Sequence, residues 1–192
     1  ILAKNLLFLL NIFIYLFFPT FSLADIQKDL INKLTKSETL SFDFKQQISN
    51  EEETGNCSIK YPLLMKCNYE NVKQKIIISN GKTVAIIKKK YKKIYYYPIK
   101  STPLFFILQK EKIIDLIKKN PPSEINLNFV VFNFIDKKKN KIKIIFDKNS
   151  LELKGWETID SYANNVSFMI DNLEINKQIV DDFFKIPKEE DL

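Results

Sequence analysis

The sequence predicts a mainly β fold with short helices: an incomplete antiparallel β-barrel, or half-barrel, covered by a helical lid that encloses an apolar cavity. Many short segments alternate apolar and polar residues with the two-residue period of a half-buried strand, and turn signals separate them. Two other regions have helical character and can cover the open end of such a sheet. Curling hides the sheet edges, and an apolar lid over a curled sheet encloses an apolar cavity.

The first 24 residues have the layout of a secretory signal peptide. Lys4 precedes an apolar run from Leu6 to Phe18, and Pro19 and the triplet Ser22-Leu23-Ala24 follow. We therefore expect cleavage near Ala24 and an exported single domain over residues 25–192. An uncleaved membrane anchor is the alternative, since roughly 20 apolar residues span a bilayer. No Cys follows the run, so we expect no lipid-modified N-terminus.

The mature chain is expected to open with an amphipathic helix and a strand. Ile26, Leu30 and Leu34 recur at helical spacing from Asp25 to about Lys36, with Asp25 placed to cap the first turn. From Leu40 to Phe44 the period changes to two, which predicts a strand with one buried face. The acidic run Glu51–Glu53 is interpreted as a solvated loop.

Two hairpins are predicted next, and the first contains both cysteines. With Tyr61–Leu63 as a three-residue loop, counting back along both strands places Cys57 opposite Cys67, within disulfide distance. An even cysteine count in an exported protein favours a disulfide, with free buried thiols as the alternative. Asn80-Gly81 marks the turn of the second hairpin.

Helices interrupt the strands in the middle of the chain. A strand is expected to end at Tyr95–Pro98, and Thr102-Pro103 is expected to start the first of two short apolar helices, which together reach Pro121. Further strands are predicted over residues 125–134, 142–146, 151–159 and 166–170, with a last edge strand over 181–186.

The composition argues against most enzymes. The chain has no His and only three Gly, which excludes His-dependent nucleophiles, the usual catalytic zinc sites and phosphate-binding loops. Asp147, Asp160 and Asp171 are assigned to turns at strand ends. We expect no enzymatic activity, no cofactor and no metal site.

Charge is the remaining compositional signal. The net charge is +7, or +6 without Lys4, and all basic residues are Lys. A basic surface can favour anionic partners, but we interpret the balance as a solvated Lys-rich surface. The runs Lys88–Lys93 and Asp136–Lys139 are interpreted as charged hairpin tips, with no nucleic-acid partner expected.

An ordered set of segments resembles the LolA family of periplasmic outer-membrane lipoprotein carriers. The matching residues are Leu40–Gln46, Gly55, Ile59–Pro62, Met65–Tyr69, Ser79–Thr83, Thr102–Leu104, Ile107-Leu108, Leu153–Trp156, Asp160, Val166–Phe168 and Phe184–Pro187. The resemblance implies a half-barrel with a lid in a monomeric periplasmic protein. It also implies that the protein accepts acylated lipoproteins from an inner-membrane ABC-type releasing complex and delivers them to an outer-membrane receptor.

The resemblance also suggests which residues bind the cargo. Where the family commonly has an Arg that holds the lid closed, this chain has Lys66, which offers fewer directed donors. The other candidates are Phe42, Phe44, Phe129, Phe168 and Ile170 on the concave face, and Leu104, Phe105, Phe106 and Leu108 on the lid. Core packing would explain any one of them equally well. Two other functions stay open: a carrier of another lipid or glycolipid, and an envelope sensor or interaction module.

Overall fold

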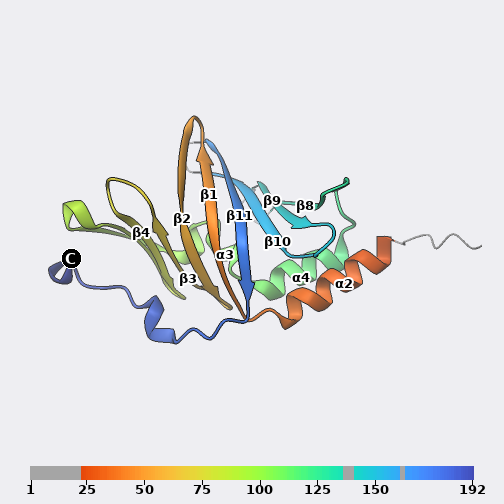
Figure 1. Ribbon diagram of the computed structural model, residues 1–192, viewed down its shortest axis with the longest axis horizontal. Coiled ribbons are helices and arrows are strands. Elements are labelled where there is room, and N and C mark those ends of the chain that lie inside the picture. The colour runs from red at the N-terminus through yellow and green to blue at the C-terminus, as the bar shows by residue number, and fades with distance from the viewer. Residues whose placement is uncertain (1–22, 136–140, 161–162) are drawn as a thin grey trace, which may run out of the picture.

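The computed structural model describes residues 23–135, 141–160 and 163–192, and Figure 1 shows their arrangement. Nearly half of them lie in strands, with three α-helices among the described residues. The helices are α2 (Leu23–Lys36), α3 (Leu104–Ile107) and α4 (Lys110–Lys119). The strands are β1 (Thr39–Ile48), β2 (Glu51–Lys60), β3 (Leu64–Tyr69), β4 (Lys75–Asn80), β5 (Thr83–Lys88), β6 (Lys93–Pro98), β7 (Glu124–Ile125), β8 (Phe129–Ile135), β9 (Lys141–Asp147), β10 (Leu153–Ile159) and β11 (Asn165–Ile175).

The strands form one antiparallel sheet in the order β6-β5-β4-β3-β2-β1-β11-β10-β9-β8-β7. The chain builds one half of the sheet from β1 outward to β6, crosses through α3 and α4, and returns from β7 to pair β11 with β1 (Figure 1). The sheet does not close into a barrel. A half-barrel with a helical lid, the fold predicted from strand periodicity, is therefore confirmed.

The predicted register of the first hairpin is confirmed. Lys60 pairs with Leu64, and Cys57 pairs with Cys67 across β2 and β3. The two cysteines are joined by a disulfide, with their Cα atoms 4.0 Å apart. Gly55 continues the same row, and a Cβ there would lie 2.0 Å from the Asn68 carbonyl oxygen and 2.9 Å from Phe44 Cζ, so the missing side chain leaves room for both.

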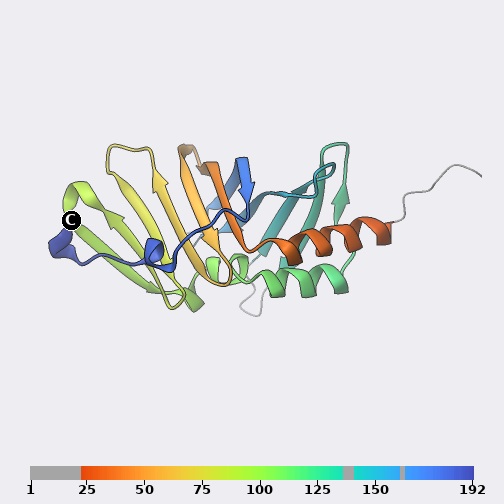
Figure 2. The same ribbon diagram turned by 60° about the horizontal axis from the view of Figure 1, so that its bottom comes forward.

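The helices cover one face of the sheet, which we call the inner face (Figure 2). Its apolar residues join those of α2, α3 and α4 in one buried cluster, which includes Leu30, Leu34, Leu40, Phe42, Phe44, Ile59, Leu108, Ile114, Phe132, Trp156 and Phe168. The burial of this shared apolar surface is the main free energy that fixes the helices on the sheet.

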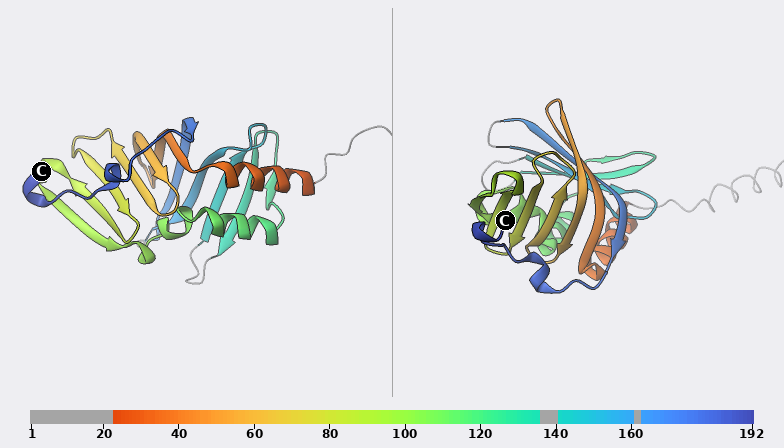
Figure 3. Two further views of the ribbon diagram at one scale, coloured as in Figure 1. Left: turned by 90° about the horizontal axis from the view of Figure 1, so that it is seen from below. Right: turned by 60° about the vertical axis from the view of Figure 1, so that its left-hand side comes forward.

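The C-terminal segment covers part of the opposite, outer face. It runs across β2, β3 and β4 as Figure 3 shows, and places Ile186 and Leu192 against a second small cluster of Ile78, Ala85, Ile87 and Ile94. Glu189 accepts a hydrogen bond from the Ile94 backbone N–H at 2.9 Å, which occupies one donor on the exposed edge of β6.

Several details differ from the sequence-based expectations. The acidic run is the first part of β2, not a loop, because Ile48 to Gln46 of β1 continue to pair with Glu51 to Glu53. The predicted edge strand over 181–186 is wrong: Asp181–Phe184 form a 3-10 turn that buries Phe184. Asp171 lies inside β11 and pairs with Lys154 rather than ending a strand.

Two expectations fall partly or wholly outside the described residues. The predicted signal peptide occupies residues 1–22, of which no structure is described, and Leu23-Ala24, which begin α2 two residues before the expected helix. The predicted tip Asp136–Lys139 also lies outside the described residues. The other lysine run lies at the tip between β5 and β6, as expected. Within the described ranges, no helix is long and apolar enough to cross a membrane.

Candidate functional site

The inner face contains a partly open apolar groove of about 670 Å³ between the sheet and α3. We call it the inner groove. Its wall combines strands from both halves of the sheet with the lid, and its principal apolar residues are Met65, Ile77, Val84, Leu104, Trp156 and Phe168. Its volume lies within the roughly 300–1,000 Å³ of typical small-molecule sites.

An aromatic stack forms the floor of the groove. Phe168 of β11 stacks on Trp156 of β10, with ring centroids 4.3 Å apart and planes 7° apart. The same Phe168 ring stacks on Phe44 at 4.6 Å and meets Phe42 edge-on at 6.2 Å. Strand pairing explains this convergence, because Trp156 lies directly opposite Phe168 across β10 and β11. The floor is therefore closely packed and apolar.

The predicted floor and lid residues are mostly brought together. Phe168 and Leu104 line the inner groove, while Phe42, Phe44, Ile170 and Leu108 are buried in the cluster beneath it. Phe105 and Phe106 are half-buried on α3. Phe106 lies 5.8 Å from the Phe134 ring, and Lys112 Nζ lies 4.2 Å from the centroid of Phe105.

Two predicted site residues lie on the outer face, and those expectations are wrong. In β8 the inward positions are Val130, Phe132 and Phe134, so alternation directs Phe129 outward. In β3, Met65 and Cys67 line the groove, which places Lys66 between them on the other side. Lys66 Nζ instead lies 4.4 Å from the Phe183 ring, and burial together with the nearby Lys89 charge lowers its pKa.

The lid is attached through backbone groups rather than through Lys66. Leu63, in the turn between β2 and β3, donates its N–H to the Leu108 carbonyl at the end of α3 at 2.9 Å. The hydroxyl of Ser79 donates to the Leu63 carbonyl at 2.6 Å and so fixes the turn from the other side. Backbone groups of any residue type can form such a contact, so the residue types in the sequence do not reveal it.

Helices α2 and α4 lie side by side and antiparallel (Figure 3), and each is bonded to the other at both ends. Gln27 of α2 donates to the carbonyls of Ile117 and Asn120, which end α4 without intrahelical partners. Lys110 of α4 donates to the carbonyls of Thr35 and Ser37 at the end of α2. The two helices therefore form one structural unit.

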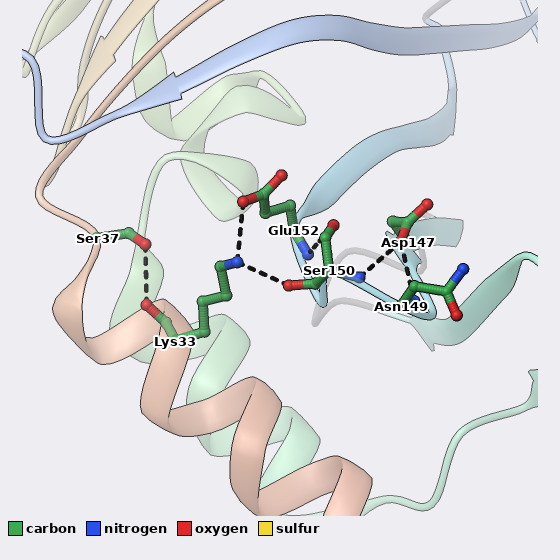
Figure 4. Close-up of polar contacts among 6 residues, drawn as sticks. All are labelled: Lys33, Ser37, Asp147, Asn149, Ser150 and Glu152. Atoms are coloured by element: carbon green, nitrogen blue, oxygen red, sulfur yellow. Dashed lines mark hydrogen bonds and ion pairs between the residues drawn. The ribbon is translucent and has the colours of Figure 1, made fainter.

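A second set of contacts fastens this unit to the sheet, as Figure 4 shows. Lys33 of α2 donates to the Ser150 carbonyl at 2.7 Å and pairs with Glu152 at 2.8 Å. The turn that presents these oxygens is shaped by Asp147, whose carboxylate accepts hydrogen bonds from the backbone N–H groups of Asn149 and Ser150. These bonds lower the pKa of Asp147.

One end of the inner groove is polar, which the sequence reasoning missed. Tyr69 donates its hydroxyl to Gln46 Oε1 at 2.5 Å, and both side chains line the groove. Lys75 Nζ lies 3.7 Å from the Tyr69 ring centroid and forms an ion pair with Glu53. Burial and the Glu53 charge both raise the pKa of Tyr69, so the hydroxyl stays protonated and remains a donor.

Basic residues gather in the half of the sheet beyond β3. Residues 71–110 contain ten of the 30 lysines and no Asp or Glu, so the rest of the chain carries more acidic than basic residues. In the hairpin tip between β5 and β6, Lys89, Lys90, Lys92 and Lys93 are exposed, as are Tyr95, Tyr96 and Tyr97 on β6. This edge borders the inner groove, because Tyr97 contributes to its wall.

Comparisons with known proteins agree with this geometry. The model of the family described as outer membrane lipoprotein carrier protein LolA matches residues 35–187. No protein of curated function matches the sequence significantly. An uncharacterised conserved protein from Thermus thermophilus is similar in structure, with a TM-score of 0.52 and 8% identity, over 86% of this chain and 94% of that one. At this identity the likeness supports the fold alone.

Two other solved structures are more distant. A LolA superfamily protein from Nitrosomonas europaea has a TM-score of 0.42 and 7% identity, over 83% of this chain and 97% of that one. MucB, in the MucA/MucB complex of Pseudomonas aeruginosa, has a TM-score of 0.46 and 9% identity, over 85% of this chain and 62% of that one. The family match covers most of the sequence and includes every strand of the half-barrel, and by this match the chain belongs to the LolA family of outer membrane lipoprotein carrier proteins.

Proposed function

We propose that this protein is a periplasmic carrier that binds the acyl chains of lipoproteins and moves them from the inner to the outer membrane. The observation that carries the proposal is the inner groove, an apolar space that the protein's own side chains leave unfilled beneath α3. Membership of a carrier family supports the same role and favours binding over catalysis.

The physical need for a carrier follows from the cargo. Each exposed methylene of an acyl chain costs about 0.8 kcal/mol in water, so a chain of ordinary length does not cross an aqueous space unprotected. The aromatic floor of Trp156 and Phe168 offers apolar surface, and Leu104 and Ile107 cover it from the lid. Affinity must stay limited because the cargo has to be released, which suits an open groove better than a closed pocket.

Direction of transfer must come from partners. We propose that an inner-membrane ABC-type complex loads the groove and that an outer-membrane receptor empties it. The lysine-rich hairpin tip at Lys89–Lys93 lies on the same edge of the sheet as Tyr97 of the groove wall and provides a surface for acidic faces of such partners. Export to the periplasm is part of the proposal, because it depends on the predicted signal peptide, and N-terminal sequencing of the mature protein tests it.

Mass spectrometry of crosslinked periplasmic complexes tests the cargo. We expect triacylated lipoproteins; free lipids alone would indicate a carrier of another lipid, and protein partners without acyl chains would indicate a sensor or interaction module. Leu104→Gln, which places an amide in the groove, should reduce captured cargo. Leu127→Gln is the matched control, because Leu127 is 86% exposed outside the groove. Equal cargo on both variants would contradict the proposal.

A further inference from the structure

Gln46 is an amide next to the aromatic floor, at the polar end of the inner groove. Its side chain is only 8% exposed, although a neutral amide has two donors and an acceptor to satisfy. Phe44 precedes it by two residues on the same face of β1, and Phe168 lies directly opposite it on β11. A buried amide without partners weakens a protein, so the position calls for a physical explanation.

Among the described residues, only the oxygen of this amide has a hydrogen-bond partner. The Tyr69 hydroxyl donates to Gln46 Oε1, whereas Gln46 Nε2 donates to no group in the described part of the chain. Every fully buried side-chain nitrogen or oxygen among the described residues does have a partner. The unpaired Nε2 therefore opens onto accessible space, and the space that Gln46 lines is the inner groove.

An occupant of the groove changes the environment of these N–H donors. In the empty groove water reaches them, but hydrocarbon alone would displace that water and leave them unpaired, which costs affinity. An occupant with a carbonyl oxygen at the same depth would accept the hydrogen bond and avoid the cost. Ester and amide carbonyls are the groups that attach fatty acyl chains to glycerol or to an amine.

On the basis of the proposed carrier function, we propose that Gln46, oriented by Tyr69, is a binding site for the carbonyl oxygen of an acyl ester or amide. The groove then prefers ester- or amide-linked chains to ether-linked chains of equal length. It also orients them. The hydrocarbon lies toward Leu104 and the polar linkage lies toward Tyr69, behind which Lys75 and Glu53 form the polar end.

The test compares two lipids that differ only in the carbonyl groups: dipalmitoylglycerol and its ether-linked counterpart, dihexadecylglycerol. Each displaces the dye 1-anilinonaphthalene-8-sulfonate from the full-length mature protein. We expect the wild type to bind the ester lipid about tenfold more tightly than the ether lipid, the effect of one hydrogen bond to an otherwise unpaired buried donor.

Gln46→Met keeps the length of the side chain and removes its donors. It should abolish the preference for the ester lipid and leave binding of the ether lipid intact. Gln47→Met is the matched control, because Gln47 is the next residue of β1, faces the other side and donates to the Ser49 carbonyl. The control should retain the wild-type preference.

The outcomes separate this inference from the proposed function. Equal binding of both lipids by the wild type, or an unchanged preference in Gln46→Met, would overturn the carbonyl site while the carrier function stands. An equal loss of both lipids in Gln46→Met would show a merely structural role and overturn it as well. If the wild type binds neither lipid, the carrier proposal itself fails, and the carbonyl site fails with it.

Discussion

Replacing Phe168 by Ala should cost more stability than any other single truncation in the groove floor. Phe168 is 5% exposed, and its ring is sandwiched between Trp156 at 4.3 Å and Phe44 at 4.6 Å. Truncation of a buried Phe to Ala typically costs about 3–5 kcal/mol, and each lost aromatic pair is part of that cost. Because the groove already opens on one side of the ring, we expect the lower end, about 3 kcal/mol.

That loss is large against a total stability of roughly 5–15 kcal/mol, so the urea midpoint should fall clearly while the slope of the transition stays the same. Far-UV circular dichroism follows unfolding independently of the altered surroundings of Trp156, the single Trp of the chain. Phe183→Ala is the control, because Phe183 is 38% exposed on the outer face, and about 1 kcal/mol is expected there. A cost at Phe168 no greater than at Phe183 would refute the close packing of the floor.

Three further predictions concern the sheet and the lid. Replacing Cys57 and Cys67 together by Ala should lower the free energy of unfolding by about 3 kcal/mol, the chain-entropy value for a sequence separation of 10, and an unchanged urea midpoint would contradict this. Because the folded-state pKa of Asp147 is lowered, its stabilising effect is present above its unfolded pKa of about 3.9 and is lost as the pH falls toward the folded value. The stability difference between wild type and Asp147→Asn, followed by urea unfolding from pH 7 to pH 3, should therefore shrink on acidification, and a constant difference would count against the assignment. Lys110→Met removes the donor to the end of α2, so amide hydrogen exchange should accelerate in α2 and α4 but not in β1; unchanged exchange would show that this contact does not hold α2 and α4 together.

Much of the fold was predictable because local signals agreed with the tertiary structure. Alternating residues predicted the strands, Asn80-Gly81 predicted a turn, and the spacing of Cys57 and Cys67 predicted their register. The lid helices were predicted from apolar runs that a solvent-facing connection would not carry. The exceptions are local as well: Glu51–Glu53 form a strand because pairing with β1 outweighs the low strand propensity of Glu.

The candidate site was predicted less completely, since it depends on which face each residue occupies. The register of the cysteine pair contains the missing information: with Cys67 inward, Met65 and Tyr69 are inward as well, and Lys66 must be outward. Phe129 was predicted on the wrong face because β8 begins at this residue, and the inward-facing positions of β8 start one residue later, at Val130. Gln46 gave no sequence signal, because a polar residue near a strand end is normally expected to be solvated.

Fluorescence quenching of Trp156 tests the central claim most directly. Trp156 is the single Trp of the chain and lines the inner groove, so its emission reports on what occupies that space. A phospholipid with brominated acyl chains should quench this emission in a saturable manner, because bromine quenches only at contact distance, whereas the unbrominated lipid should not. The same titration with Leu104→Gln should show weaker quenching than with Leu127→Gln. Saturable quenching that depends on Leu104 is the result we predict; emission that brominated and unbrominated lipids leave equally unchanged would contradict the claim that acyl chains bind in the groove.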